Sequence, residues 1–176
     1  MILDRVEDIF MIFAVDVAYH EDSACVAGVL FETWESSSFE KVYTKRVDSI
    51  AGYESGAFYK RELPCILSLL DEVSEPIDFI ILDGYVFLGE DRSAGLGVHL
   101  WNEINRRTPI IGVAKNYYKD TPAECEILRG KSQKPLYITS IGVDLEDAKK
   151  YILKMHGLNR MPTLLKKVDQ ISKSVE

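Results

Sequence analysis

The stretch Ile9-Phe10-Met11-Ile12-Phe13-Ala14-Val15-Asp16-Val17-Ala18 decides the fold. A nearly continuous apolar run, rich in β-branched and aromatic residues, is typical of a strand covered on both faces. Asp16, near the end of the run, is the exception. Residues 77–83, Ile-Asp-Phe-Ile-Ile-Leu-Asp, repeat the arrangement and end on Asp83. A buried carboxylate is costly unless a cation or hydrogen-bond donors compensate, so both aspartates are candidate site residues.

The two aspartates would meet at one edge of a sheet if their strands were neighbours. Hard oxygen ligands on rigid strands suit Mg²⁺ or Mn²⁺. Each aspartate alone has an ordinary alternative, as a helix cap or as the partner of a lysine.

The segments around these strands predict a mixed sheet. Residues 24–31 and 39–47 read as strands joined by a polar connection at 32–38, which indicates an antiparallel meander. Strands and helices then alternate, as expected for parallel β-α units. This order resembles a ribonuclease H-like α/β fold. The later elements are a helix at 61–73 with Pro64 in its first turn, a strand at 77–83, a helix at 95–107, strands at 109–114 and 135–139, and helices at 145–155, with Asp144 as N-cap, and 161–172.

Length and composition indicate one domain spanning residues 1–176, with 47% hydrophobic and 28% charged residues and no linker-like segment. There is no apolar run of about 18 residues, so no membrane span is expected. The acidic start of the chain lacks the basic character of a secretory signal, which favours a cytoplasmic protein. Cys25, Cys65 and Cys125 have neither disulfide nor zinc spacing, and we expect them to be buried.

Charge is unevenly distributed along the chain. Residues 1–114 hold 9 basic and 20 acidic side chains, whereas residues 115–176 hold 12 basic and 8 acidic ones. The second half could face phosphates, although solvated helix faces explain the same charges. If nucleic acid is the partner, a basic rim should flank the site, formed by Lys115, Lys119, Arg129, Lys131 and Lys134.

Five short segments, in this order, resemble the motifs of the endonuclease V family, and Asp169 falls where that family carries an acidic or histidine residue on its last helix. The segments are Tyr-Glu-Ser-Gly-Ala-Phe-Tyr-Lys-Arg-Glu-Leu-Pro at 53–64, Leu-Asp-Gly at 82–84, Pro-Ile-Ile-Gly-Val-Ala-Lys at 109–115, Lys-Pro-Leu-Tyr-Ile at 134–138 and Asn-Arg-Met-Pro at 159–162.

This resemblance implies a monomeric, metal-dependent endonuclease that acts on DNA or RNA containing a deaminated purine. It would cut one nucleotide to the 3′ side of hypoxanthine or inosine, with Mg²⁺ as cofactor and Mn²⁺ as a possible substitute. By resemblance, the metal ligands would be Asp16, Glu62, Asp83 and Asp169. Lys115 would act beside the scissile phosphate, and Tyr53 and Gly84 would contact the lesion.

Ordinary roles remain open for these residues too. Glu62 could complement a helix dipole, Lys115 could be a surface lysine, and Tyr53 could be a packing residue. The family's usual Asp-Gly-His-Gly reads Asp-Gly-Tyr-Val at 83–86, and Glu90 and Asp91 stand where basic residues are usual.

Three functions are therefore weighed. The first is the nuclease, which the set of Asp16, Glu62, Asp83 and Lys115 favours, because a binding module needs no such convergence of charged groups. The second is an altered or non-catalytic descendant that binds structured nucleic acid or another partner. The third is a small-molecule phosphohydrolase, which would need a pocket rather than an open groove.

Overall fold

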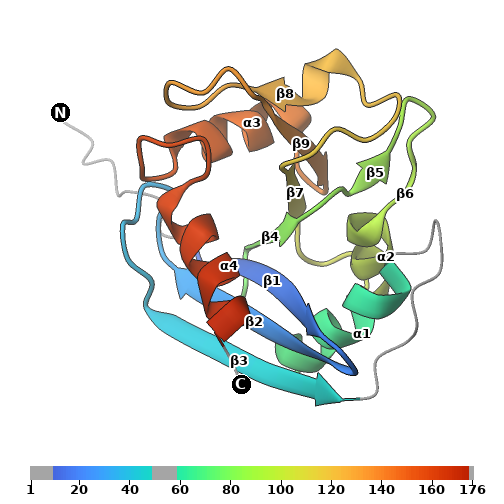
Figure 1. Cartoon of the computed structure of the whole chain (residues 1–176), viewed down its shortest axis with the longest axis vertical. Helices are drawn as coiled ribbons and strands as arrows, with labels where there is room; N and C mark the ends of the chain where they lie inside the picture. Colours follow the sequence, from blue (N-terminus) through green and yellow to red (C-terminus); the bar gives the residue numbers. More distant parts are fainter. Residues whose placement is uncertain (1–9, 49–58, 175–176) are drawn as a thin grey trace, which may run out of the picture.

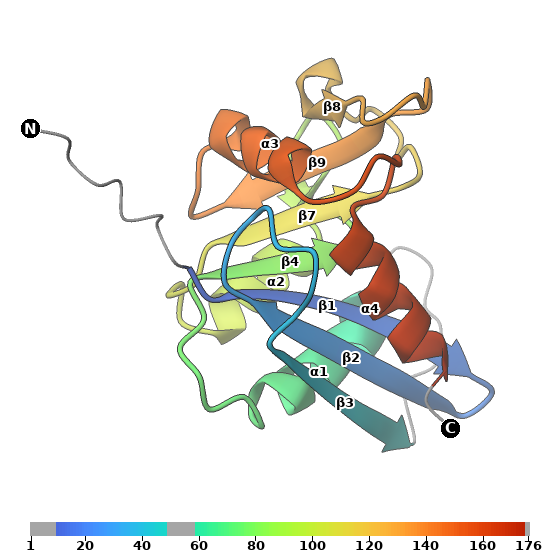
Figure 2. The ribbon, with the colours of Figure 1, turned by 90° about the vertical axis from the view of Figure 1, so that its left-hand side faces the viewer.

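A mixed β-sheet with helices on both faces forms the body of the molecule (Figures 1 and 2). The structure is a computed structural model and describes residues 10–48 and 59–174. The large sheet contains β1 (Ile12–His20), β2 (Ser23–Phe31), β3 (Lys41–Asp48), β4 (Phe79–Asp83), β7 (Ile110–Ala114), β8 (Glu126–Ile127) and β9 (Leu136–Ile141). The other elements are α1 (Tyr59–Leu70), β5 (Phe87–Leu88), β6 (Ser93–Ala94), α2 (Leu96–Glu103), the short 3-10 helix η1 (Ala123–Cys125), α3 (Leu145–Lys154) and α4 (Thr163–Ser174).

The strand order of the large sheet is β3-β2-β1-β4-β7-β9-β8. The first three strands form the predicted antiparallel meander, and β4 and β7 follow it in parallel to β1. The predicted α/β fold class is therefore confirmed. One expectation was wrong: β9 pairs with β7 in the antiparallel sense, so the series of parallel units stops at β7.

Two apolar layers hold the helices to the sheet. Helices α1 and α2 cover one face, and α3 and α4 cover the other (Figure 2). Along β1 the side chains alternate, so that Phe13 and Val15 point into the α1 layer while Ala14 points into the α4 layer. Asp16 continues the second series and therefore faces α4.

Close packing of β1 against β2 requires a glycine at one point. A Cβ atom on Gly28 would lie 2.0 Å from the ring of Phe13, so a side chain there would displace that ring from the core. Phe13 is fully buried.

Two local expectations are corrected by the observed bounds. Asp16 lies inside β1 rather than near its end, because pairing with β2 extends the strand to His20. Helix α1 begins at Tyr59, two residues earlier than predicted, so Pro64 lies in its second turn and removes one interior backbone hydrogen bond.

Other expectations agree with the structure. Asp144 occupies the N-cap position of α3, although its side chain makes no capping hydrogen bond. The three cysteines are buried as thiols. None of the helices within residues 10–48 and 59–174 is long and apolar enough to cross a bilayer.

Candidate metal centre

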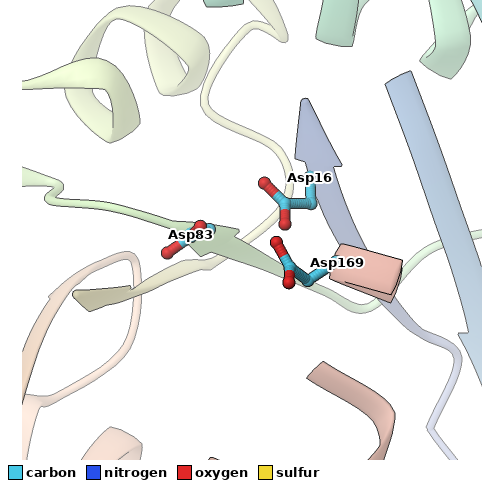
Figure 3. A group of neighbouring side chains, drawn as sticks. All are labelled: Asp16, Asp83 and Asp169. Atoms are coloured by element: carbon cyan, nitrogen blue, oxygen red, sulfur yellow. The ribbon is translucent and has the colours of Figure 1, made fainter. Parts of the chain in front are cut away.

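Three aspartates from three different elements converge beside the central strands β1 and β4 (Figure 3). Val15 on β1 pairs with Leu82 on β4, and this register places Asp16 beside Asp83. Helix α4 packs across β1 and β2 and brings Asp169 to the same point. One carboxylate oxygen from each aspartate lies within 4.8 Å of the others. The structure thus brings together three of the four expected metal ligands.

Asp16 is the most buried member of this group, with only 8% of its surface exposed. Burial, followed by the negative charge of Asp83, raises the pKa of Asp16 to about 8. Its Oδ1 accepts a hydrogen bond of 2.8 Å from the backbone N–H of Val17, which opposes part of this shift. The fold therefore holds a carboxyl group where repulsion and desolvation favour its protonated form.

Two lysines compensate part of the negative charge. Lys115 Nζ lies 3.7 Å from Asp83 Oδ2 and 3.9 Å from Asp169 Oδ1. Lys173, one turn further along α4, approaches Asp169 Oδ2 to 3.0 Å. Burial raises the pKa of Asp83 despite the opposing charge of Lys115. Burial acts in the same direction on Asp169, but its hydrogen bonds and the nearby lysines lower its pKa overall.

Glu62 stands outside the group of three. It lies on α1, which covers the face of the sheet opposite to α4 (Figure 2). Burial, and then the charge of Asp83, raise the pKa of Glu62 to about 7. The Tyr19 hydroxyl and the positive charge of Arg61 oppose part of this shift. The charge of Asp83 thus acts both on Asp16, which faces α4, and on Glu62, which lies on α1.

Arg160 positions the backbone that carries Lys115. Its guanidinium donates hydrogen bonds to the backbone carbonyls of Lys115, Lys134 and Pro135. These bonds tie the end of β7 to the start of β9. The sequence marked Arg160 only as part of a short motif, because the acceptors of its guanidinium are backbone groups that no side-chain pattern reveals.

One member of the predicted basic rim, Arg129, is wrong. Arg129 is 5% exposed, and its guanidinium donates to the carbonyls of Met155, Gly157, Asn159 and Arg160, so it stabilises the loop before α4 instead of facing solvent. The four lysines of the predicted rim are at least partly exposed: Lys115, Lys119, Lys131 and Lys134.

Two residues expected to contact the lesion differ in what can be described. Gly84 follows Asp83 directly with a φ of +142°, and a Cβ atom there would meet nothing within 4 Å, so open space lies beside its backbone. Tyr53 lies outside the described residues.

The chemistry of the three aspartates fits a divalent cation. Three hard oxygen donors lie within 4.8 Å of one another. Because the pKa of Asp16 is raised, its carboxyl group ionises more readily when a nearby cation offsets the negative charge. The cavity beside them has a volume of only about 10 Å³, roughly enough for one water molecule. Among the described residues, the cavity beside the three aspartates is too small to enclose a small-molecule substrate.

An α/β sheet of this strand order defines the class of ribonuclease H-like proteins, and three aspartates gather beside its central strands. The family model described as Endonuclease V matches residues 3–150. This chain belongs to the endonuclease V family, which makes it a nuclease. Asp169 lies beyond the matched segment.

Individual relatives agree with this assignment. Endonuclease V of Pyrococcus horikoshii is 31% identical over 173 residues, which cover 96% of this chain and 76% of the relative. The crystal structure of endonuclease V from Streptomyces avermitilis is 27% identical, with a TM-score of 0.74 and coverage of 94% of this chain and 81% of the other.

A third relative shares the fold at lower identity. Endonuclease V of Ciona intestinalis, crystallised with a 24mer DNA containing an inosine followed by a ribo-adenosine, has a TM-score of 0.75 and 22% identity. The likeness covers 96% of this chain and 86% of that one.

Proposed function

We propose that this protein hydrolyses a phosphodiester one nucleotide to the 3′ side of a deaminated purine in DNA or RNA, with Mg²⁺ as cofactor and Mn²⁺ as a possible substitute. The observation that carries the proposal is the convergence of Asp16, Asp83 and Asp169 within 4.8 Å beside Lys115, in a chain of this family. The inosine-containing DNA bound by the Ciona relative supports the choice of substrate.

The three aspartates would hold the metal ion. When bound, Mg²⁺ neutralises charge on the phosphate and lowers the pKa of a water molecule, which makes that water a stronger nucleophile. Lys115 Nζ, 3.7 Å from Asp83, places a fixed positive charge where it can offset the charge that develops on the phosphate.

Glu62 fits a role in proton transfer. With a pKa of about 7, its carboxylate can accept a proton from water near neutral pH and release it again. Its position on α1, outside the group of Asp16, Asp83 and Asp169, suits a base better than a ligand shared with Asp16. We therefore propose Glu62 as a catalytic residue that accepts and releases a proton.

Recognition of the lesion rests on Gly84 and Tyr53. The open space beside the Gly84 backbone would admit an extruded base, and the ring of Tyr53 would occupy the gap that this base leaves in the stack. The products would carry a 3′ hydroxyl and a 5′ phosphate. We assign the chain to the cytoplasm as a single-domain monomer, and its three buried thiols suit a reducing compartment.

The test is a cleavage assay on matched oligonucleotides with inosine in DNA and in RNA, in Mg²⁺ and in EDTA. Asp83→Asn keeps the shape of the side chain but removes its charge. We expect it to slow single-turnover cleavage at least about 100-fold, or about 2.7 kcal/mol, while binding survives. The exposed Asp71→Asn serves as the matched control and should cleave like the parent.

A second candidate is the altered descendant that binds nucleic acid without cutting it. Glu90 and Asp91 line a surface cavity together with Lys119, so acidic groups stand next to one lysine of the expected rim. Binding of inosine oligonucleotides without metal-dependent cleavage by the parent would put this candidate first. Cleavage by Asp83→Asn at the parent's rate would refute the proposed mechanism.

A further inference from the structure

The segment after β7 presents exposed aromatic rings next to the metal centre. Residues 115–120 read Lys-Asn-Tyr-Tyr-Lys-Asp, and Tyr117 and Tyr118 are 60% and 41% exposed. A tyrosine that served only to pack the core would bury its ring. Aromatic residues placed between lysines are typical of surfaces that bind unpaired nucleotides.

The ring of Tyr117 is held in place although it is exposed. Its hydroxyl accepts a hydrogen bond of 3.1 Å from the backbone N–H of Asp120, which has a φ of +61°. One side of the ring meets Tyr137 edge to face, with centroids 5.8 Å apart. A ring anchored at its hydroxyl and along one side loses little conformational freedom when a ligand stacks on it.

The backbone of the same segment is braced from the metal centre itself. Tyr85, two residues after Asp83, donates from its hydroxyl to the carbonyl of Asn116 at 2.6 Å and accepts from the N–H of Tyr118 at 3.1 Å. Thr121 then donates from its hydroxyl to the carbonyl of Tyr118. The carboxyl end of β4 therefore fixes the position of the aromatic segment.

The Cα atom of Tyr117 also lies close to that of Lys115. Lys115, whose ammonium contacts Asp83 and Asp169, is two residues away, and two residues span at most about 7 Å. A nucleotide whose phosphate reaches the metal centre would have its base, or the neighbouring base, within reach of this ring.

We propose that Tyr117 is a stacking position for a nucleobase beside the scissile phosphate, separate from the position expected for Tyr53. The inference rests on the proposed function, because it takes the metal centre as the place of cleavage. The ligand is an unpaired nucleotide of DNA or RNA, and stacking makes the contact largely independent of which base it is. Tyr85 is a positioning residue, because the hydrogen bonds of its hydroxyl fix the backbone on either side of Tyr117.

The test is a double-mutant cycle between the protein and the oligonucleotide, read as binding by fluorescence anisotropy in EDTA. Tyr117→Ala should weaken binding of an inosine oligonucleotide about 5- to 150-fold. The same comparison is then made on oligonucleotides that each lack one base on either side of the expected cut. When the base that stacks on Tyr117 is missing, the parent and Tyr117→Ala should bind equally. When any other base is missing, Tyr117→Ala should still bind more weakly than the parent. Tyr117→Phe keeps the ring but loses its hydroxyl anchor, so it should weaken binding less than Tyr117→Ala does. Leu153→Ala, at an exposed residue on α3, should stay within about twofold of the parent.

Two results would overturn the inference: unchanged binding by Tyr117→Ala, or an equal loss on every oligonucleotide that lacks one base. Because the readout is binding, it does not depend on catalysis. Failure of the proposed function would instead appear as a parent that binds these oligonucleotides but cuts none of them in Mg²⁺.

Discussion

The buried carboxyl groups should make the metal-free protein less stable as the pH rises. The pKa of Asp16 is about 8 in the fold and 3.8 in the reference state. The folded chain therefore holds a proton that the unfolded chain has lost between these values, and its stability falls with pH across that window. Glu62, with a pKa of about 7, acts in the same direction. Asp169 has a lowered pKa, so its opposite effect is confined to pH values below 3.8.

The size of the effect follows from proton counting. One bound proton changes the free energy of unfolding by about 1.4 kcal/mol per pH unit, so Asp16 alone should cost about 3 kcal/mol between pH 5 and pH 7. Asp16→Asn cannot ionise, and its unfolding free energy should lack this part of the slope. If Mg²⁺ is the cofactor, as proposed, it should bind the deprotonated carboxylates and stabilise the parent more at pH 7 than at pH 5.

The assay is urea unfolding of the parent and of Asp16→Asn at pH 5, 6 and 7, in EDTA and in Mg²⁺. Taking the difference in slope between the two proteins cancels the histidines and other groups that titrate in both. Asp71→Asn, a change of an exposed aspartate, should keep the parental slope. Equal slopes for the parent and Asp16→Asn in EDTA would show that Asp16 is ionised in the metal-free fold, contrary to the reasoning.

Three further changes test other parts of the structure. Arg129→Ala leaves four carbonyls without their donor and should lower the free energy of unfolding by about 2–4 kcal/mol. The exposed Lys131→Ala should leave this free energy unchanged. Urea unfolding measures both variants, and equal effects would contradict the structural role of Arg129. Gly84→Ala forces a side chain into a φ of +142°, so it should lower the free energy of unfolding by about 1–3 kcal/mol or displace Asp83 and slow cleavage. A variant with parental stability and a parental cleavage rate would contradict this prediction. Tyr53→Ala should reduce the preference for inosine over unmodified oligonucleotide by about 5- to 150-fold, and an unchanged ratio of cleavage rates would exclude the proposed stacking.

The direction of β9 was predicted incorrectly from the sequence, because the connection that precedes this strand was not considered. The apolar run before residue 140 correctly indicated a strand, but its direction was assigned by extending the preceding β-α pattern. A parallel strand needs a crossover connection, usually a helix, and the segment between β7 and β9 contains only the three-residue helix η1 and the short strand β8. The absence of a helical pattern between the two strands could therefore have indicated an antiparallel β9.

Arg129 shows a different limit. Its charge predicted a surface position, which is the usual place for an arginine. The structure buries it because the loop before α4 offers four backbone carbonyls to its donors. Backbone acceptors have no side-chain signature, so the sequence could not distinguish this arginine from one that faces phosphate.

The sequence by itself determined the fold class, the long strands of the sheet and, at Asp16 and Asp83, two of the three aspartates, because apolar runs and the carboxylates inside them are local features. Only the tertiary structure decided which carboxylates meet. Asp16 and Asp169 are far apart in the chain and come together because α4 packs over β1, whereas Glu62 is held on the other face by α1. The faces that helices cover depend on the packing of the whole sheet, and distance along the chain carries no information about it.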